Sequence, residues 1–583
     1  MVKLSNAVGQ YRNANASADG IAVSAGEYSD VGIYTVSAPA LQPLASAGAF
    51  NADFQWETSV GLPDHINDHL GGTLRGNPVL PHGPNSPGTV RWQLDAGVEI
   101  APTRGVITFS FLDSAHATGI YNNPNQGFTE QFGFSPFSQA QRVAGRTAIQ
   151  NWDDLIAPTF QEVNGSGGAD IVLANTTTGP AQAWAYYPYD YGRANYKHLM
   201  SDAWIATPSA NGSNGQLLPG QYGLQTLNHE LGHSLGLSHP GAYNFGDDQD
   251  GDGQPDPITY DGDAFYFQDS NQFSIMSYFD SFETGAQNID WNVMRFLYPS
   301  TPMVDDVFVI QQKYGADLTT RAGDTVYGFN STADVTNEAM KFRPGEMATI
   351  FTIWDAKGND TLDLSGYATD SVIDLREGAY SSAGGWGAYD ASLIGVAPTL
   401  ALINANNTAA GMGPRSASLF QTYFQGTEGV NEGLSWKAIT GTGDKLLMEQ
   451  NIGIAYGAII ENAVGGSGND RINGNQADNS FTGNGGADTF ILARYDGVVP
   501  VTTGGTKTVI DTSTDTITDF LSGVDKLDLS SFAGVTLANV NWDSATDTLR
   551  VDTDHDGIFN ETNDAVFIVH GSDIVAGDYI FAT

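Results

Sequence analysis

Residues 228–241 read NHELGHSLGLSHPG and place three of the chain's ten histidines, with a glutamate, inside eleven positions. Side chains four residues apart lie on one face of a helix, so His229 and His233 are expected to direct their imidazoles at the same point. Glu230 directly follows the first histidine and would lie beside that point. The stretch therefore predicts a helix with clustered metal-ligand side chains.

The third histidine of this stretch requires the chain to turn back. His239 is too far along to share the helical face, whereas Gly236 can adopt the left-handed conformation that ends a helix, and Pro240 cannot continue one. Three imidazoles leave a tetrahedral zinc ion one open position for water, as in catalytic sites. A helix with unrelated surface histidines is the alternative, and the full spacing H-E-x-x-H-x-x-G-x-x-H disfavours it.

The composition restricts the remaining possibilities. A chain of 583 residues is too long for one ordinary core, so two or more domains are expected. The net charge of −42 argues against nucleic acid and anionic membrane surfaces as partners. With no cysteine in the chain, zinc would need histidine and oxygen ligands. The excess of carboxylates favours either solubility or binding of calcium, which prefers oxygen.

The N-terminal region resembles neither a signal peptide nor a membrane anchor. Its first twenty residues lack an apolar core, and no run of 18 apolar residues occurs anywhere. Residues 1–75 are rich in Ala, Ser, Gly and Asn and are interpreted as an extension or pro-segment. We therefore expect no membrane span, and either a cytoplasmic protein or export by another route.

Hydrophobic periodicity predicts an α+β domain over residues 76–303. It indicates strands at 106–114 and 169–176 and helices at 140–156, 226–237 and 304–315, with an aromatic run at 183–192 between them. After residue 315 Gly, Asp, Asn and Thr dominate and helical patterns nearly vanish. Residues 304–583 are thus predicted to form an all-β domain.

A nine-residue repeat occurs inside the predicted β domain. Residues 465–491 divide into GGSGNDRIN, GNQADNSFT and GNGGADTFI, with Ile472, Phe481 and Phe490 at the same eighth position. Stacked units of this kind favour a parallel β-roll that buries one apolar residue per turn. A flexible Gly-rich linker is the alternative, and it would show no such register.

A second motif completes a resemblance to a known family. FSIMSYF (273–279) supplies the Met-turn expected downstream of a metzincin zinc helix, with Met276 packing beneath the metal. The two motifs together resemble the serralysins, zinc proteases of the metzincin group. The resemblance implies that His229, His233 and His239 bind zinc, that Glu230 is the general base, and that Tyr278 is a further zinc ligand that stabilises the oxyanion. It also implies that residues 183–188 form an edge strand for an extended substrate.

The same resemblance implies calcium sites in the C-terminal region. Its motifs at 321–331, 352–367 and 459–470 assign calcium ligands, several of them through backbone carbonyls, to Arg321, Gly323, Thr325, Asp355, Lys357, Gly358, Asp360 and Glu461. A site shared between stacked turns is assigned to Gly466, Gly468, Asp470, Gly483, Gly485 and Asp488.

The chain departs from the family pattern in several places. Lys357 stands where the family favours glycine, Asn479 replaces an aspartate, and residues 386–444 look like an insertion. Two acidic loops at 248–256 and 552–560 begin like calcium loops but lack the closing glutamate, so an Asp-rich turn is the alternative for each. Near the end, GDYIF resembles the tail read by type I exporters, followed by two further residues.

The resemblance implies a secreted, monomeric zinc endopeptidase that acts on proteins or peptides. It would leave the cell unfolded through type I secretion machinery, then fold as calcium neutralises the clustered carboxylates of its β-roll (RTX) domain. The alternative is a calcium-dependent surface or adhesion protein whose protease domain is vestigial.

Overall fold

The computed structural model describes residues 90–102, 105–114, 130–165, 168–179, 182–188, 201–241, 243–244, 256–333, 337–425, 446–495, 497–501, 505–509, 513–560 and 564–582. The predicted pro-segment, residues 1–75, and most of the acidic loop 248–256 lie outside these ranges. Within them the chain forms two compact units. The first unit contains the described residues up to Gly285 and from Tyr298 to Asp317, and the second contains residues 286–297 and the chain from Leu318 onward.

A five-stranded sheet forms the framework of the first unit. Its order is β2-β1-β3-β5-β4, with bounds of Thr159–Glu162, Val106–Phe111, Ile171–Thr176, Ala203–Ala206 and Ala183–Ala185. The first four strands are parallel, whereas β4 runs antiparallel to β5 at the edge. The strands predicted at 106–114 and 169–176 are confirmed, but β2 was not predicted, because its residues are mostly exposed and show no apolar alternation.

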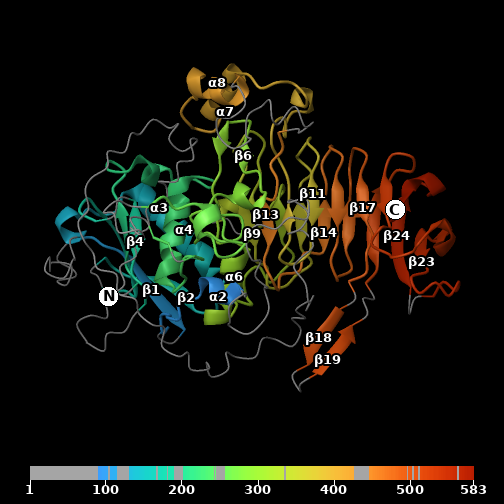
Figure 1. Cartoon of the computed structure of the whole chain (residues 1–583), viewed down its shortest axis with the longest axis horizontal. Helices are drawn as coiled ribbons and strands as arrows, with labels where there is room; N and C mark the ends of the chain where they lie inside the picture. The colour runs from blue at the N-terminus through green and yellow to red at the C-terminus, as the bar shows by residue number, and fades with distance from the viewer. Residues whose placement is uncertain are drawn as a thin grey trace. The chain divides into compact units, whose positions relative to one another are not determined.

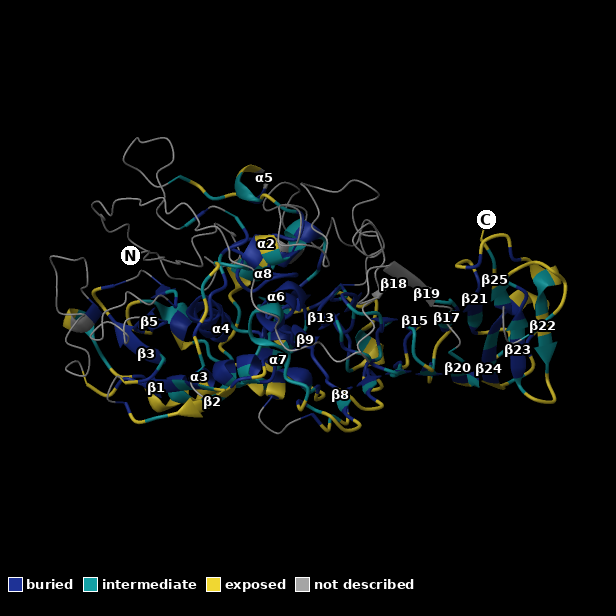
Figure 2. Ribbon diagram, turned by 90° about the horizontal axis from the view of Figure 1, so that it is seen from below, coloured by how far each residue is buried: buried dark blue, intermediate teal, exposed yellow. Residues whose placement is uncertain are grey.

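The helices of the first unit are α2 (Val90–Leu94), α3 (Gln139–Asp153), α4 (Tyr222–Ser234), α5 (Tyr260–Asp263) and α6 (Val304–Tyr314). α3 begins with a reciprocal capping box between Ser138 and Gln141. α4, predicted at 226–237, begins one turn earlier, and every one of its residues is buried, as its dark blue ribbon in Figure 2 shows. A helix enclosed on all sides is a rigid element on which to place functional side chains.

The second unit contains two sheets whose parallel strands succeed one another along the chain (Figure 1). The larger is ordered β22-β23-β24-β20-β16-β14-β10-β8, with bounds of Val540–Asp543, Thr548–Val551, Ala565–Gly571, Asp515–Phe520, Ser480–Thr482, Asn462–Val464, Thr361–Asp363 and Val326–Gly328. The smaller is ordered β11-β15-β17-β21-β25, with bounds of Val372–Asp374, Arg471–Asn473, Thr489–Ile491, Lys526–Asp528 and Tyr579–Ile580. At one end of the larger sheet β22 pairs antiparallel with β23, and β23 pairs antiparallel with β24.

Shorter pairings complete the second unit. β12 (Tyr380–Ser381), β13 (Ile452–Ile454) and β9 (Phe351–Ile353) form a three-stranded sheet, while β18 (Gly497–Val501) pairs with β19 (Gly505–Val509) and β6 (Ile289–Asp290) with β7 (Arg295–Phe296).

Successive nine-residue repeats enter opposite sheets, so the predicted register is visible in the pairing. Ile472 in β15 pairs with Phe490 in β17, and Phe481 in β16 pairs with Ala463 in β14. All four side chains are fully buried. The apolar eighth position therefore fills the space between the two sheets, which a flexible linker would not do.

The expectation that helices nearly vanish after residue 315 is wrong for the insertion. α7 (Leu400–Ala409) and α8 (Ala417–Gln425) lie beside β6 in Figure 1, and Ile403 packs with Trp291 and Met294 in one core cluster. Arg295 also donates to the side chain of Asn407 at 2.8 Å. The insertion is thus packed onto the segment 286–297. None of the helices in the described ranges is long and apolar enough to cross a membrane.

Candidate metal centre

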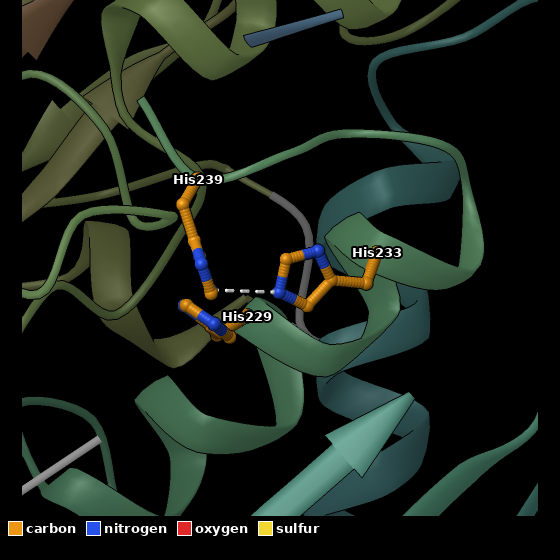
Figure 3. A group of neighbouring side chains, drawn as sticks. All are labelled: His229, His233 and His239. Atoms are coloured by element: carbon orange, nitrogen blue, oxygen red, sulfur yellow. Dashed lines mark hydrogen bonds between the residues drawn. The ribbon is translucent and has the colours of Figure 1, made fainter. Parts of the chain in front are cut away.

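Three histidines converge in the first unit (Figure 3). His229 and His233 project from the same face of α4, and His239 comes from the loop that follows it. One ligand nitrogen of each lies within 4.8 Å of the others, and all three side chains are buried. The predicted helix, the turn and the convergence of the three imidazoles are therefore present.

Backbone carbonyls fix the orientation of each imidazole. The Nδ1 atoms lie 2.7 Å from the Ile275 carbonyl for His229, 2.7 Å from the Leu237 carbonyl for His233, and 3.0 Å from the Tyr243 carbonyl for His239. A carbonyl can only accept, so each Nδ1 bears the hydrogen and each Nε2 presents a lone pair. This is the outer-shell arrangement that orients histidine ligands for a metal.

The donor set fits a cation. The Nε2 atoms of His233 and His239 face each other at 3.1 Å, and two lone pairs at that distance repel unless a positive charge lies near them. Burial lowers the pKa of His229 to about 4 and holds the pKa values of His233 and His239 well below the ordinary range. The imidazoles are thus neutral near pH 7, as metal binding requires.

Glu230 directly follows His229 on α4 and is completely buried. Neither of its carboxylate oxygens has a hydrogen-bond partner among the described residues, and burial raises the pKa of this carboxyl well above its ordinary value. An unpartnered buried carboxyl is costly, and a nearby cation would favour its charged form. The surroundings of Glu230 therefore also fit a metal centre.

The predicted Met-turn lies directly under α4. A Cβ atom on Gly232 would come 2.4 Å from the Met276 sulfur, so only glycine allows this approach. Asp306, in the first turn of α6, accepts hydrogen bonds from Ser274 at 2.7 Å and from the Ile275 backbone N–H at 2.6 Å. The turn is thus held between two helices, and with it the carbonyl that orients His229.

Two tyrosines line the cluster beside His239. The ring of Tyr278 lies 4.5 Å from that of His239, and the Tyr243 ring stacks on His239 at 5.6 Å with an interplanar angle of 12°. Both tyrosines belong to an aromatic cluster with Tyr222, Tyr260 and Phe279. Tyr243 was not singled out from the sequence, because an aromatic four residues after a histidine carries no distinctive signal.

The aromatic run contributes the edge strand β4, and the predicted substrate role of residues 183–188 remains a prediction. Tyr187 follows that strand, and its ring meets the His233 ring edge to face at 5.6 Å. Burial raises the pKa of the Tyr187 hydroxyl, and the nearby Glu230 carboxylate raises it further. The end of the edge strand therefore borders the metal centre.

Gly236 makes the turn to His239 possible. Its φ angle is +90°, and a Cβ atom there would lie 1.9 Å from the Val98 carbonyl oxygen. The next residues are held by segment 90–98. Leu237 forms an isolated antiparallel β-bridge with Asp95, and the Ser238 N–H donates to the Leu94 carbonyl at 2.7 Å. The loop between the second and third histidines is therefore fixed on both sides.

In the second unit, the predicted calcium residues contact one another through backbone and carboxylate groups. The Thr325 N–H donates to Asp360 at 2.7 Å, and the Asp360 N–H donates to Glu461 at 2.7 Å. Burial raises the pKa of Asp360 to about 8, with the nearby Asp355 as the next cause, and burial raises the pKa of Asp355 to about 6. These acids lie close together, but among the described residues no three of them bring one ligand atom each to within 4.8 Å of the others.

A ladder of aspartates follows the stacked turns. The Ser371 N–H donates to Asp470 at 2.7 Å, the Asp470 N–H to Asp488 at 2.8 Å, and the Asp488 N–H to Asp525 at 3.0 Å. Asp525 was missed from the sequence, because it lies outside the nine-residue units and comes near Asp488 only through the pairing of β17 with β21. We call Asp470, Asp488 and Asp525 the aspartate ladder.

Asn479 differs from these aspartates as the sequence indicated. Its side-chain N–H₂ group donates to the Glu461 carbonyl at 3.1 Å and to Asn475 at 2.9 Å. The amide therefore satisfies with hydrogen bonds a position where the family pattern has a carboxylate.

One of the two acidic loops forms a cluster of carboxylates. Asp552, Asp554 and Asp564 bring one carboxylate oxygen each to within 4.8 Å of the others, so Asp564 supplies the acid that position twelve lacks. Calcium binding there remains a prediction. The loop 248–256 lies outside the described residues except for Asp256.

Comparison with known proteins supports one family for both regions. Residues 316–405 and 440–566 match the family model "Peptidase M10 serralysin C terminal". The unmatched stretch, 406–439, falls within the insertion predicted at 386–444. The match thus covers most of the second unit but not the histidine cluster.

Relatives extend the match. The chain is 32% identical over 450 residues to "Metallopeptidase AprA" of Pseudomonas marginalis, covering 74% of this chain and 75% of that protein. It is 31% identical over 419 residues to "Serralysin" of Photorhabdus luminescens, covering 68% and 67%, and 35% identical over 374 residues to "Serralysin C" of Dickeya chrysanthemi, covering 62% and 57%. The chain thus spans little more than half the length of some curated relatives that it matches. The chain belongs to the serralysin family (peptidase M10).

Proposed function

We propose that this chain is a secreted zinc endopeptidase that hydrolyses peptide bonds in proteins or peptides. The observation that supports it most is the convergence of three buried histidine nitrogens, two of them from the helix that also carries the buried Glu230. His229, His233 and His239 would hold the zinc ion. The boundaries of a catalytic domain at 76–303 and a calcium-binding domain at 304–583, and the pro-segment role of residues 1–75, belong to the proposal.

The chain's own groups have distinct tasks in this reaction. Zinc in such a site supplies Lewis acidity, which polarises a carbonyl and makes water nucleophilic near neutral pH. Glu230 accepts the proton of the attacking water on its carboxylate and delivers it to the leaving amine. The Tyr278 hydroxyl donates a hydrogen bond to the developing oxyanion. An extended substrate adds to the sheet along β4.

Calcium would stabilise the second unit as a parallel β-roll. The family match, the alternating parallel strands and the aspartate ladder support this assignment. Clustered carboxylates oppose folding until a cation neutralises them, so the chain could leave the cell unfolded through type I secretion machinery and fold outside. The proposal includes an extracellular, monomeric protease.

Casein hydrolysis tests the proposal. We expect cleavage by the calcium-refolded protein, loss of cleavage with a zinc chelator, and recovery on adding zinc. Glu230→Gln should cleave at least about 100-fold more slowly with unchanged zinc content, because it keeps the side-chain shape but cannot accept the proton. Glu162→Gln, which removes a surface carboxylate of the same unit, is the matched control and should cleave like wild type.

The contradicting result would be a folded, zinc-loaded wild type that cleaves nothing, both with and without residues 1–75. That outcome would favour the calcium-dependent surface or adhesion protein with a vestigial protease domain.

A further inference from the structure

We propose that Asp269 is a positioning residue for the metal centre, because its carboxylate joins the loop of His239 to the turn of Tyr278. The inference rests on the proposed zinc protease function and deepens it. Asp269 lies outside both sequence motifs, 30 positions after the third histidine and seven before Met276.

A single oxygen of Asp269 accepts both hydrogen bonds. Its Oδ1 atom accepts from the Tyr243 hydroxyl at 2.7 Å and from the Ser277 hydroxyl at 2.8 Å. The side chain is completely buried, and Oδ2 has no hydrogen-bond partner among the described residues. Two segments 34 residues apart in sequence, at Tyr243 and Ser277, are thus fixed to the same atom.

The first bond acts on His239 through Tyr243. The Tyr243 carbonyl accepts from His239 Nδ1 at 3.0 Å, and the Tyr243 ring stacks on the His239 imidazole. Tyr243 is therefore held at its hydroxyl by Asp269 while its backbone and ring set the rotation of His239. Losing the hydroxyl bond would release the residue that directs the third Nε2 toward the other two.

The second bond acts on Tyr278 through the preceding residue. Ser277 donates to Asp269, and its oxygen accepts from the Phe279 N–H at 3.0 Å. These two bonds fix the backbone on both sides of Tyr278, whose ring lies 5.1 Å from that of Tyr243. Asp269 therefore sets the spacing between the third histidine and the tyrosine.

Stability alone does not account for a carboxylate at this position. A buried charge costs free energy unless its bonds compensate, and well-packed apolar residues often replace buried polar groups without loss. An outer-shell residue of a metal site, by contrast, typically affects metal affinity or activity by 10- to 100-fold. The two explanations predict different responses of the metal site.

Zinc affinity and the cobalt spectrum test the role without relying on cleavage. Zinc affinity is measured by competition with a chromophoric chelator, and ligand geometry by the visible absorption of the cobalt(II)-substituted protein. Asp269→Ala should bind zinc about 10- to 100-fold more weakly and change the cobalt spectrum. Asp269→Asn keeps an acceptor oxygen, so its zinc affinity should stay within about threefold of wild type.

Asp290→Ala is the matched control. Asp290 is a buried aspartate of the second unit whose carboxylate accepts three hydrogen bonds, so its loss removes comparable interactions from the unit that does not contain the histidines. It should leave zinc affinity and the cobalt spectrum unchanged. Should Asp269→Ala fail to fold, Tyr243→Phe and Ser277→Ala each remove one bond, and each should weaken zinc binding several-fold.

The role would be overturned by a folded Asp269→Ala, or by both single-bond variants, with wild-type zinc affinity and cobalt spectrum. It would also be overturned by an equal loss of zinc affinity in Asp290→Ala. A wild type that binds zinc but does not cleave casein would contradict the protease function instead, and would leave the zinc measurements to decide the role of Asp269.

Discussion

The histidine cluster and the aspartate ladder experience the same physical effect with opposite consequences. Burial disfavours charge, so it lowers the pKa of His229 to about 4 and raises that of Asp488 to about 7. A neutral imidazole is the form that binds zinc, whereas a neutral carboxyl is not the form that binds calcium. The first site is therefore ready once the unit folds, while the second requires a cation for its charged form to be stable.

Calcium removal should give the largest effect. Without the ion, carboxylates in the second unit repel one another, so chelation should greatly lower the thermal midpoint of unfolding. Adding zinc instead should raise the midpoint only through its binding to the first unit. Calorimetry with and without chelator measures both. An unchanged midpoint in chelator would remove the contrast between the two regions.

The pH dependence sharpens that prediction. Burial raises the pKa of Asp470 to about 6 and that of Asp488 to about 7, above the unfolded value near 4. The folded chain then binds more protons than the unfolded chain in this window. The contribution of these two protonated carboxyls to the stability of the folded chain is therefore complete below about pH 4 and is lost as the pH rises through about 6 to 7.

Denaturant unfolding in chelator, at pH values from 4 to 8, checks this slope. In chelator, the double variant Asp470→Asn/Asp488→Asn should be more stable than wild type at high pH, because it has no charge at these two positions. This difference in the free energy of unfolding should become smaller as the pH falls and the wild-type carboxyls are protonated. Saturating calcium should suppress the difference in slope. Parallel curves for wild type and variant in chelator would show that these two carboxyls do not govern the response.

Gly236→Ala should have the next largest effect. The substitution places a Cβ atom against the Val98 carbonyl at a left-handed backbone position, so it should lower the free energy of unfolding by about 3 kcal/mol. Zinc affinity should fall with it, because the turn leads to His239.

Gly105→Ala is the control for the backbone conformation alone. Its φ angle is +76°, but a Cβ atom there would meet nothing within 4 Å, so the cost should be about 1 kcal/mol with normal zinc binding. Chemical denaturation of both variants gives the comparison, and equal losses would show that the Val98 contact does not matter.

Sequence predicted the parts of both regions that depend on local spacing. The zinc helix, the Gly236 turn and the register of Ile472, Phe481 and Phe490 follow from fixed periods along the chain. The carbonyl partners of the three Nδ1 atoms were not predictable, because every residue has a carbonyl and only the tertiary fold brings the right one near.

The missed features have the same origin. Asp269 reaches Tyr243 across 26 residues, and Asp525 reaches Asp488 across 37, so no short motif marks them. Helices α7 and α8 were overlooked because the whole stretch after residue 315 was interpreted from its composition. Their stability depends on packing against residues 286–297, which a local pattern does not show.

Asn479→Asp should replace a side chain that is held by hydrogen bonds with a carboxylate whose stability depends on a bound cation. In chelator it loses the two bonds donated by the amide, so we expect destabilisation by about 1–3 kcal/mol. In calcium the variant should recover more stability than wild type does. Thermal unfolding with and without calcium measures this, and Asn469→Asp adds the same charge at an exposed position as a control. A smaller calcium response than wild type would contradict the prediction.

Lys357→Ala should have the smallest effect. Its side chain is exposed, and the contact it makes with Asp355 is donated by the backbone N–H at 3.0 Å. We expect a change in stability within about 0.5 kcal/mol and a nearly unchanged calcium requirement for refolding. A large shift in that requirement would mean that the departure from the family's glycine matters.

Anomalous diffraction at the zinc absorption edge, from crystals containing zinc and calcium, tests the central claim most directly. The account predicts one strong zinc peak among the Nε2 atoms of His229, His233 and His239. Absence of density there, or zinc bound only at the carboxylates of the second unit, would contradict it.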